Sequence, residues 1–191
     1  MKRLLIIFLF LISFFINSDK NSTKEIVILH TNDIESVYEP IQAVWRDDIE
    51  LIGGISHLAS LIDNVRASEE ISFLMDAGDI YTGALSKKTR GKLPFDLYNA
   101  MGYDVLNIGN HEFEYNWEPL VEIIPTANFP VLNANIFIEK TGELIARPFT
   151  VLKKSGVKIG VIGVMGIDAF YNTMAPFHRT GLSIKDPTET A

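Results

Sequence analysis

Residues that could bind metal ions or transfer protons follow three short apolar segments of the sequence. The carboxyl ends of strands in α/β proteins open into a crevice, so side chains placed there can share one site. We therefore expect the three segments to form three edges of one pocket. In chain order, the polar residues are Asp33 and Glu35 after 25–30, Asp76 and Asp79 after 71–75, and Asn110, His111, Glu112 and Glu114 after 105–108.

The residue types favour metal-assisted chemistry. Asp33, Glu35, Asp79 and Asn110 offer the oxygen ligands that hard divalent cations prefer. Asp79 follows a glycine, where its carboxylate could lie between two ions. His111 is then a candidate to protonate a leaving group or to stabilise charge on a transferring phosphoryl group. Two metal ions would activate a water and hold both oxygens of an in-line displacement.

Each of these residues also has a structural interpretation. Acidic residues at strand ends are often helix caps or turn formers. We expect His30, inside an apolar segment, to be packed in the core, and His57 and His178 to face solvent. Trp45 and Trp117 are expected to serve packing. The metal-site interpretation therefore depends on the ordered set of motifs and not on any single residue.

The apolar pattern predicts alternating strands and helices followed by a hairpin, which is typical of an α/β protein with mixed sheets. Segment 81–92 is expected to be a loop, segment 41–52 has no clear pattern, and Pro187 suits the first turn of a helix. The expected strands are 25–30, 71–75, 105–108, 131–136, 149–152 and 157–164, and the expected helices are 55–66, 95–101 and 119–124.

Length and composition indicate one globular domain. The chain has 191 residues, of which 47% are hydrophobic and 21% charged, and its net charge is −7. An acidic protein is a poor partner for nucleic acid, but a phosphate substrate is still compatible because bound metal ions reverse the local charge. Because there is no cysteine, disulfides and thiolate metal sites are excluded.

The N-terminus has the pattern of a targeting segment. Lys2 and Arg3 precede an apolar run at 4–16, which is short for a membrane span. We expect residues 1–18 to be a signal peptide, with an uncertain cleavage site, and the protein to be exported to the periplasm or the extracellular space. The alternative is an uncleaved anchor, through which alone the protein would contact a membrane.

Taken together, the motifs resemble the opening motifs of the secreted 5′-nucleotidase/UDP-sugar hydrolase family. This family is part of the calcineurin-like metallophosphoesterases. The resemblance extends over essentially all of residues 25–191 and is specific because the motifs occur in order. The motifs that carry it are 29–33, 53–54, 76–79, 102–104, 109–113, 129–130, 134–136 and 160–163.

The resemblance implies a four-layer α/β/β/α metallophosphoesterase sandwich, with residues 25–191 as the N-terminal portion of the catalytic domain. It implies two divalent metal ions (Mn, Mg, Zn or Ca). By position, Asp33 resembles a ligand of the first metal, Asp79 the bridging carboxylate and Asn110 a ligand of the second metal. His111 resembles the catalytic histidine. The later metal-ligand segments and the C-terminal substrate-binding domain of the family have no counterpart in this sequence.

The sequence departs from the family pattern at two of the matching positions. Glu35 replaces a histidine ligand, which adds negative charge and favours harder cations such as Mg²⁺ or Mn²⁺ over Zn²⁺. Glu114 replaces the aspartate that orients the catalytic histidine, and its extra methylene could displace the imidazole by about 1 Å.

Three functions are compatible with these observations. The first is metal-dependent hydrolysis of a phosphomonoester of 5′-nucleotidase type, with a nucleotide or related small molecule as substrate. The second is a truncated, non-catalytic relative, or half of a split protein that a C-terminal chain completes. The third is an exported nucleotide-binding module without chemistry. The missing ligands motivate the second, which also predicts exposed apolar surface where another polypeptide would pack.

Overall fold

The structure is a computed structural model, and it describes residues 23–191. The predicted signal peptide, residues 1–18, lies outside the described residues. Within the described residues, no helix is both long and apolar enough to cross a membrane.

A four-stranded parallel sheet forms the centre of the fold. Its strands are β1 (Val27–Thr31), β4 (Ser72–Asp76), β5 (Val105–Asn107) and β6 (Val131–Leu132), in the spatial order β1-β4-β5-β6. Parallel neighbours need a crossover connection, and here helices supply it. The predicted α/β fold class, with strands and helices alternating along the chain, is confirmed.

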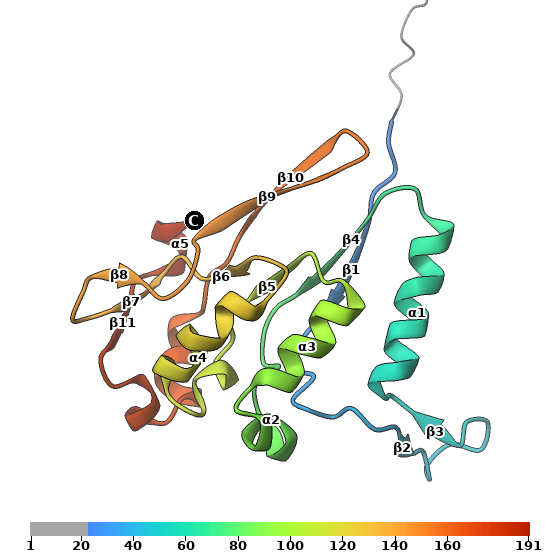
Figure 1. The fold of residues 1–191 in the computed structure, drawn as a ribbon, viewed down its shortest axis with the longest axis horizontal. Helices are drawn as coiled ribbons and strands as arrows, with labels where there is room; N and C mark the ends of the chain where they lie inside the picture. The colour runs from blue at the N-terminus through green and yellow to red at the C-terminus, as the bar shows by residue number, and fades with distance from the viewer. Residues whose placement is uncertain (1–22) are drawn as a thin grey trace, which may run out of the picture.

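Three helices cover one face of this sheet. Figure 1 shows α1 (Ile55–Ser68), α3 (Lys92–Met101) and α4 (Trp117–Ile123) side by side in front of the strands. Each buries apolar side chains in a core shared with β4 and β5, and burial of each large side chain contributes about 1.5–3 kcal/mol. The core includes Ile62, Phe95, Tyr98 and Leu120 from the helices and Leu74 and Leu106 from the strands.

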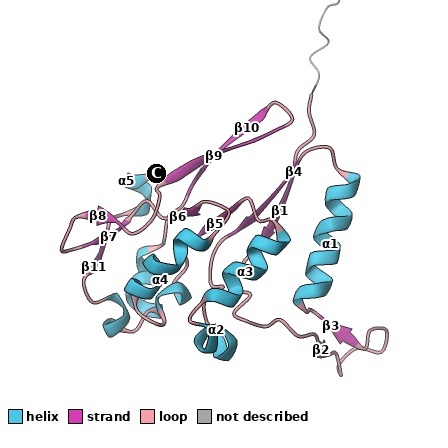
Figure 2. Ribbon diagram, in the orientation of Figure 1, coloured by secondary structure: helices cyan, strands magenta, loops and turns pink. Residues whose placement is uncertain are grey.

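The remaining strands are antiparallel. The predicted hairpin is present as β9 (Phe149–Lys154) and β10 (Val157–Ile162), which extend beyond the central sheet in Figure 2. A second sheet has the order β11-β7-β8, and the segment without a clear pattern holds the short pair β2 and β3. These strands are β2 (Ile41–Gln42), β3 (Leu51–Ile52), β7 (Ile136–Ile138), β8 (Glu143–Leu144) and β11 (Leu182–Ile184).

Short helical turns connect these elements. The final turn, α5 (Pro187–Thr190), begins as the sequence predicts, because the Asp186 side chain accepts the backbone N–H groups of Thr188 and Glu189. The other short elements are α2 (Gly83–Thr89), η1 (His111–Phe113), η2 (Ile124–Thr126), η3 (Ala169–Thr173) and η4 (Pro176–Arg179).

Two of the predicted elements are wrong. Segment 81–92 is not a loop, because it contains α2 and the start of α3, separated by the left-handed residues Arg90 and Gly91. Segment 131–136 is not one strand, because the buried Asn133 side chain accepts the N–H groups of the next residues and turns the chain. Because the chain turns here, β6 belongs to the parallel sheet and β7 to the antiparallel sheet.

His30 is also not the core histidine that the sequence predicts. β1 is an edge strand of the sheet, and alternate side chains of an edge strand point away from the helices. His30 is exposed on this outer face, and Ile28 beside it is 55% exposed.

Candidate functional site

The turns that follow β1, β4 and β5 are in direct backbone contact. The N–H groups of Asp33 and Glu35 donate to the carbonyl oxygens of Gly78 and Asp79, each at 3.0 Å. A Cβ on Gly78 would lie 2.4 Å from the backbone nitrogen of Gly109, so only glycine allows the second and third turns to approach this closely. The three edges predicted from the sequence therefore meet.

Asp79 lies at the centre of this contact. Its Oδ1 accepts the backbone N–H of His111 at 2.8 Å, and a Cβ on Gly109 would lie 2.3 Å from that oxygen. Burial is the main cause that raises the pKa of Asp79, and the charge of Asp33 and a hydrogen bond between the two side chains raise it further. The His111 N–H and the charge of His111 act in the opposite direction. The side chain of Asp33 is thus close enough to Asp79 to influence its protonation.

The two turns that carry these acids hold non-glycine residues in the left-handed region. The φ angles are 54° at Asp33, 47° at Glu35, 58° at Ser36 and 64° at Asp79. This conformation is uncommon for residues with a side chain, and it gathers at functional sites, where the surrounding structure holds it in place. Here the backbone hydrogen bonds between the turns provide that restraint.

His111 lies between two glutamates. Its Nδ1 is 2.7 Å from Glu114 Oε1, and its Nε2 is 3.5 Å from Glu35 Oε1. The second oxygen of Glu114 accepts the Thr82 hydroxyl at 2.5 Å. Burial disfavours the charged imidazole, but the hydrogen bond to Glu114 and the charges of Asp79, Glu114 and Glu35 outweigh it and raise the pKa of His111.

Glu112 is a site residue that the sequence motif contains but that reasoning from it did not select. Its side chain is fully buried. One oxygen accepts the N–H groups of Asp79 at 2.9 Å and Gly109 at 2.6 Å, and the other accepts those of Ile80 at 2.7 Å and Tyr81 at 3.2 Å. It therefore joins the second and third turns. The sequence gives only a weak signal for this role, because an acidic residue beside His111 could equally be a metal ligand. The structure shows instead that Glu112, in the η1 turn, is buried.

Asn110 lies at a cavity of about 230 Å³ with His111 and Glu114. The far side of this cavity is formed by the segment 173–178, including His178. The prediction that His178 faces solvent is wrong, because its Nδ1 is buried and its ring packs on Phe177. His57 is exposed, as predicted.

The structure brings five of the six predicted site residues into contact with one another and places the sixth beside them. Contacts run from Asp33 to Asp79, from Asp79 to His111, and from His111 to Glu35 and Glu114. Asn110 shares a cavity with His111 and Glu114. Asp33 borders a different, largely apolar cavity of about 320 Å³.

The donor chemistry is compatible with a divalent cation, although the geometry is incomplete. The charge of Asp33 raises the pKa of Asp79, a repulsion that a bound cation would relieve, and Glu35 and Asn110 add further oxygen donors. In the part of the chain that the structure describes, however, no three histidine, aspartate or glutamate side chains are arranged to hold an ion. The predicted ligand set thus stays a prediction.

Comparison with known proteins gives one family. The family model described as calcineurin-like phosphoesterase matches residues 26–168. A 5′-nucleotidase of Vibrio cholerae is 33% identical over 178 residues, and protein UshA of Escherichia coli is 32% identical over 178 residues. Each alignment covers 91% of this chain and 31% of the relative. The chain thus spans about a third of the length of these relatives.

Solved structures give the same fold. The 5′-nucleotidase precursor from Thermus thermophilus has a TM-score of 0.75 at 27% identity, over 86% of this chain and 32% of that one. The NAD nucleotidase of Haemophilus influenzae has a TM-score of 0.73 at 27% identity, over 86% of this chain and 30% of that one.

Proposed function

Because the chain belongs to the calcineurin-like phosphoesterase family, we propose that it takes part in metal-dependent hydrolysis of a phosphomonoester of 5′-nucleotidase type. Proteins of this family use divalent metals. The names of the similar proteins support a nucleotide or a related small phosphoester as the substrate. The proposed catalytic set is the one predicted from the sequence, with Glu112 added as its support.

Each side chain has a defined task in this proposal. Asp33, Glu35, Asp79 and Asn110 would hold the two divalent ions, which when bound supply a Lewis acid at the phosphoryl oxygens and a more acidic water. Glu114 orients the imidazole of His111 through Nδ1 and leaves Nε2 directed toward Glu35. His111 Nε2 then donates a proton to the oxygen of the leaving group.

One observation carries this proposal. The turns that follow three neighbouring parallel strands carry Asp33, Asp79 and His111, and hydrogen bonds join these turns: the Asp33 N–H donates to the Gly78 carbonyl oxygen, and the His111 N–H donates to Asp79 Oδ1. An acidic residue that only caps a helix or forms a turn would accept hydrogen bonds from backbone N–H groups of its own segment, as Asp186 does. Contact across three turns favours a shared catalytic or binding site.

The test is phosphate release from nucleoside monophosphates in the presence of Mn²⁺ or Mg²⁺. Asp79→Asn keeps the shape of the side chain and removes its charge, and it should abolish the metal-dependent rate. Asp96→Asn is the matched control, because Asp96 is an exposed acid of α3 paired with Lys92. Hydrolysis that survives Asp79→Asn would contradict the proposal.

A second candidate function follows from exposed apolar surface on the hairpin. We propose as the alternative that this chain is a non-catalytic portion that another polypeptide must complete. In the described structure, Phe149 and Ile162 pair across β9 and β10, yet they are 57% and 50% exposed. Ile28 on β1 is exposed as well, and contiguous apolar surface of the kind that Phe149 and Ile162 form marks protein interfaces.

The two candidates differ in measurable ways. Tight binding of two Mn²⁺ ions by a monodisperse, cooperatively unfolding monomer would support the catalytic function. Weak Mn²⁺ binding, together with self-association that Phe149→Lys relieves, would support the incomplete portion. Isothermal titration calorimetry and sedimentation velocity provide these measurements.

Export of the protein is also a proposal, which the pattern of residues 1–18 supports. The N-terminal residue of the endogenous protein, determined by mass spectrometry of the exported fraction, tests it. A mature N-terminus between residues 17 and 25 would support cleavage of the signal peptide, and recovery of the protein only in the cytoplasm would contradict export.

A further inference from the structure

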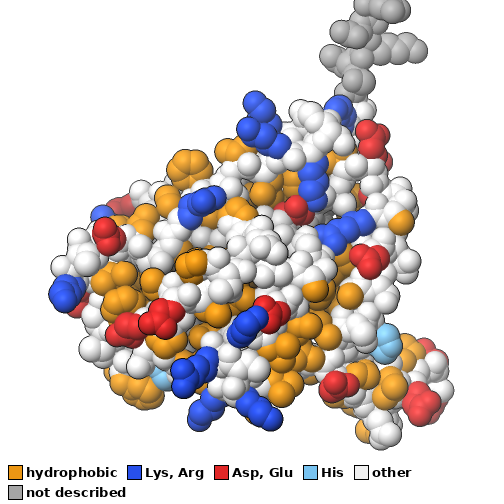
Figure 3. All heavy atoms as spheres, in the orientation of Figure 1, with side chains coloured by type: hydrophobic (Ala, Val, Ile, Leu, Met, Phe, Trp, Pro, Cys, Tyr) orange, Lys and Arg blue, Asp and Glu red, His pale blue; other side chains and the backbone are white. Residues whose placement is uncertain are grey.

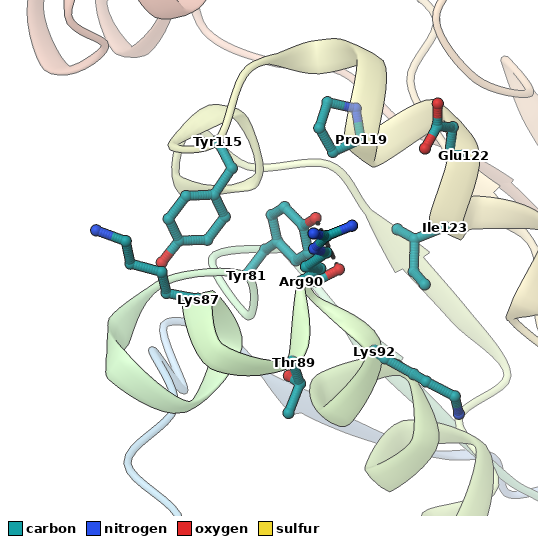
Figure 4. Close-up of a pocket in the computed structure, with 9 residues that line it drawn as sticks. All are labelled: Tyr81, Lys87, Thr89, Arg90, Lys92, Tyr115, Pro119, Glu122 and Ile123. Carbon is teal, nitrogen blue, oxygen red and sulfur yellow. Dashed lines mark hydrogen bonds between the residues drawn. The ribbon is translucent and has the colours of Figure 1, made fainter.

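Another cavity lies on the helical side of the molecule, between the turn that joins α2 to α3 and the helix α4. Its volume is about 600 Å³, and none of the six predicted site residues lines it. Figure 4 shows the turn on one side with Arg90, helix α4 on the other with Ile123 and Glu122, and Tyr115 at one end.

Two packed aromatic rings, those of Tyr81 and Tyr115, form the floor of this cavity. Tyr81 is fully buried, and its hydroxyl donates to the Arg90 carbonyl oxygen at 3.3 Å. Gly91 lies so close to the ring that a Cβ there would be 1.4 Å from a ring carbon. Tyr115 packs edge-on against Tyr81, with ring centroids 5.4 Å apart. The α2–α3 turn is therefore held against two aromatic rings.

The walls of the cavity differ in charge. Lys87, Arg90 and Lys92 line one side, and Glu122 is the acid among the lining residues. Lys92 is paired with Asp96 at 2.6 Å, whereas within residues 23–191 neither Lys87 nor Arg90 forms an ion pair. Figure 3 shows basic side chains gathered at the lower edge of this face, over α2. In a chain of net charge −7, this concentration of positive charge is a local feature.

We propose that this cavity is a binding site for a small organic phosphate that carries a planar ring. Arg90, whose guanidinium lies at the centre of the view in Figure 4, would contact the phosphate oxygens, and Lys87, which points past Tyr115, would add positive charge at that end of the cavity. The ring would rest on the apolar side formed by Tyr115, Pro119 and Ile123.

The dimensions favour a small molecule of this class. Cavities for small ligands measure about 300–1,000 Å³ and combine a mainly apolar lining with a small number of polar or charged groups. A bare inorganic anion would leave the apolar side unused, and an extended acidic peptide would not be enclosed by a space of about 600 Å³. Three of its four charged lining residues are cationic, so the site can attract a phosphate without a metal ion.

The test uses ADP as the probe and the full chain in the presence of EDTA, with binding measured by isothermal titration calorimetry. EDTA removes divalent ions from the predicted metal site, so ADP bound there through metal is not measured. The double variant Lys87→Gln/Arg90→Gln should weaken ADP binding by about tenfold or more, because it removes both cations, and tenfold corresponds to about 1.4 kcal/mol of lost interaction. Both side chains are exposed, so the core is unchanged.

Lys88→Gln is the matched control. Lys88 is an exposed cation beside Lys87 that does not line the cavity, and its removal should change ADP affinity less than twofold. Pyrophosphate should bind more weakly than ADP, because it has no ring to contact the apolar side.

Three results would overturn the proposal: no ADP binding in EDTA, an equal loss in Lys88→Gln and the double variant, or equal affinity for pyrophosphate and ADP. Asp79→Asn should leave this binding unchanged, so failure here is distinguishable from failure of the proposed hydrolysis.

Discussion

The imidazole of His111 and the carboxylate of Glu114 are joined at 2.7 Å between Nδ1 and Oε1 within a single turn of the chain. The longer glutamate side chain, where similar proteins are expected to have aspartate, therefore does not break the pair. The reason is a third residue, because Thr82 donates its hydroxyl to the other oxygen of Glu114 and fixes its position. The extra methylene is accommodated by this anchor.

Removal of the anchor should slow the proposed hydrolysis while the fold is retained. Thr82→Val keeps the shape of the side chain and removes only the hydroxyl, so Glu114 can move and His111 is less well oriented. Partners of this kind typically contribute 10–100-fold, and we expect a loss of about tenfold in the initial rate of phosphate release. Thr180→Val, at an exposed threonine, is the control and should retain the rate. Equal rates in both variants would show that Thr82 does not position Glu114.

Glu112 should be required for stability rather than for chemistry alone. Its four backbone hydrogen bonds join the turns after β4 and β5. Glu112→Ala would leave buried N–H groups without acceptors, each at a cost of about 1–3 kcal/mol. We expect a loss of more than about 3 kcal/mol in the free energy of unfolding, and a smaller loss in Glu112→Gln, which keeps one acceptor oxygen. Urea denaturation followed by circular dichroism measures both.

The control for Glu112 is Glu122→Ala, because Glu122 is an exposed glutamate of α4. An exposed substitution of this kind usually changes stability by less than about 0.5 kcal/mol. If Glu112→Ala were as stable as Glu122→Ala, the turns would be held together by contacts other than the buried carboxylate.

The sequence predicts the parallel strands and their polar ends because both follow from local patterns. Apolar runs form buried strands, and polar residues at their ends project from one edge of the sheet. It does not predict the burial of Glu112 or the Thr82 anchor, because these depend on contacts about 30 residues apart. The prediction that His30 is packed in the core is wrong for a similar reason, since the position of β1 at the edge of the sheet depends on the topology and not on local sequence.

The loop at 81–92 shows a further limit of local patterns. Gly83 and Gly91 indicate breaks, and a helix does begin at Gly83 and end before Gly91, but seven residues of α2 give too short a pattern for periodicity to identify. The sequence therefore also does not predict the cavity of Figure 4, because the turn between α2 and α3 creates its cationic side.

Gly109→Ala should displace the Asp79 carboxylate. The added Cβ would lie 2.3 Å from Asp79 Oδ1 and 2.8 Å from the Asp79 backbone nitrogen, which is shorter than nonbonded contact allows. We expect a stability loss of about 1–3 kcal/mol, typical of overpacking, and weaker binding of Mn²⁺. Gly166→Ala is the control, since a Cβ there meets no atom within 4 Å. Unchanged Mn²⁺ affinity in Gly109→Ala would argue against Asp79 as a metal ligand.

Asp76 lies beneath the site and gives a prediction on pH. Its carboxylate accepts the hydroxyls of Thr31 at 2.6 Å and Tyr98 at 2.7 Å, and the N–H of Gly78 at 2.7 Å. Burial nevertheless outweighs these hydrogen bonds and raises the pKa of Asp76 from 3.8 to about 6. The folded protein therefore holds the proton more tightly than the unfolded chain does.

The sign of the pH effect follows from this difference. Well below pH 3.8 both states are protonated at Asp76, and its full stabilising contribution is present; as pH rises from 3.8 to about 6, the unfolded chain releases the proton first and stability falls. A shift from 3.8 to about 6 corresponds to roughly 3 kcal/mol. Asp76→Asn should remove this part of the pH dependence, whereas Asp96→Asn, at an exposed acid, should retain it. Urea unfolding from pH 4 to 7 measures the difference, and parallel curves for the two variants would mean that Asp76 is ionised in the folded protein throughout this range.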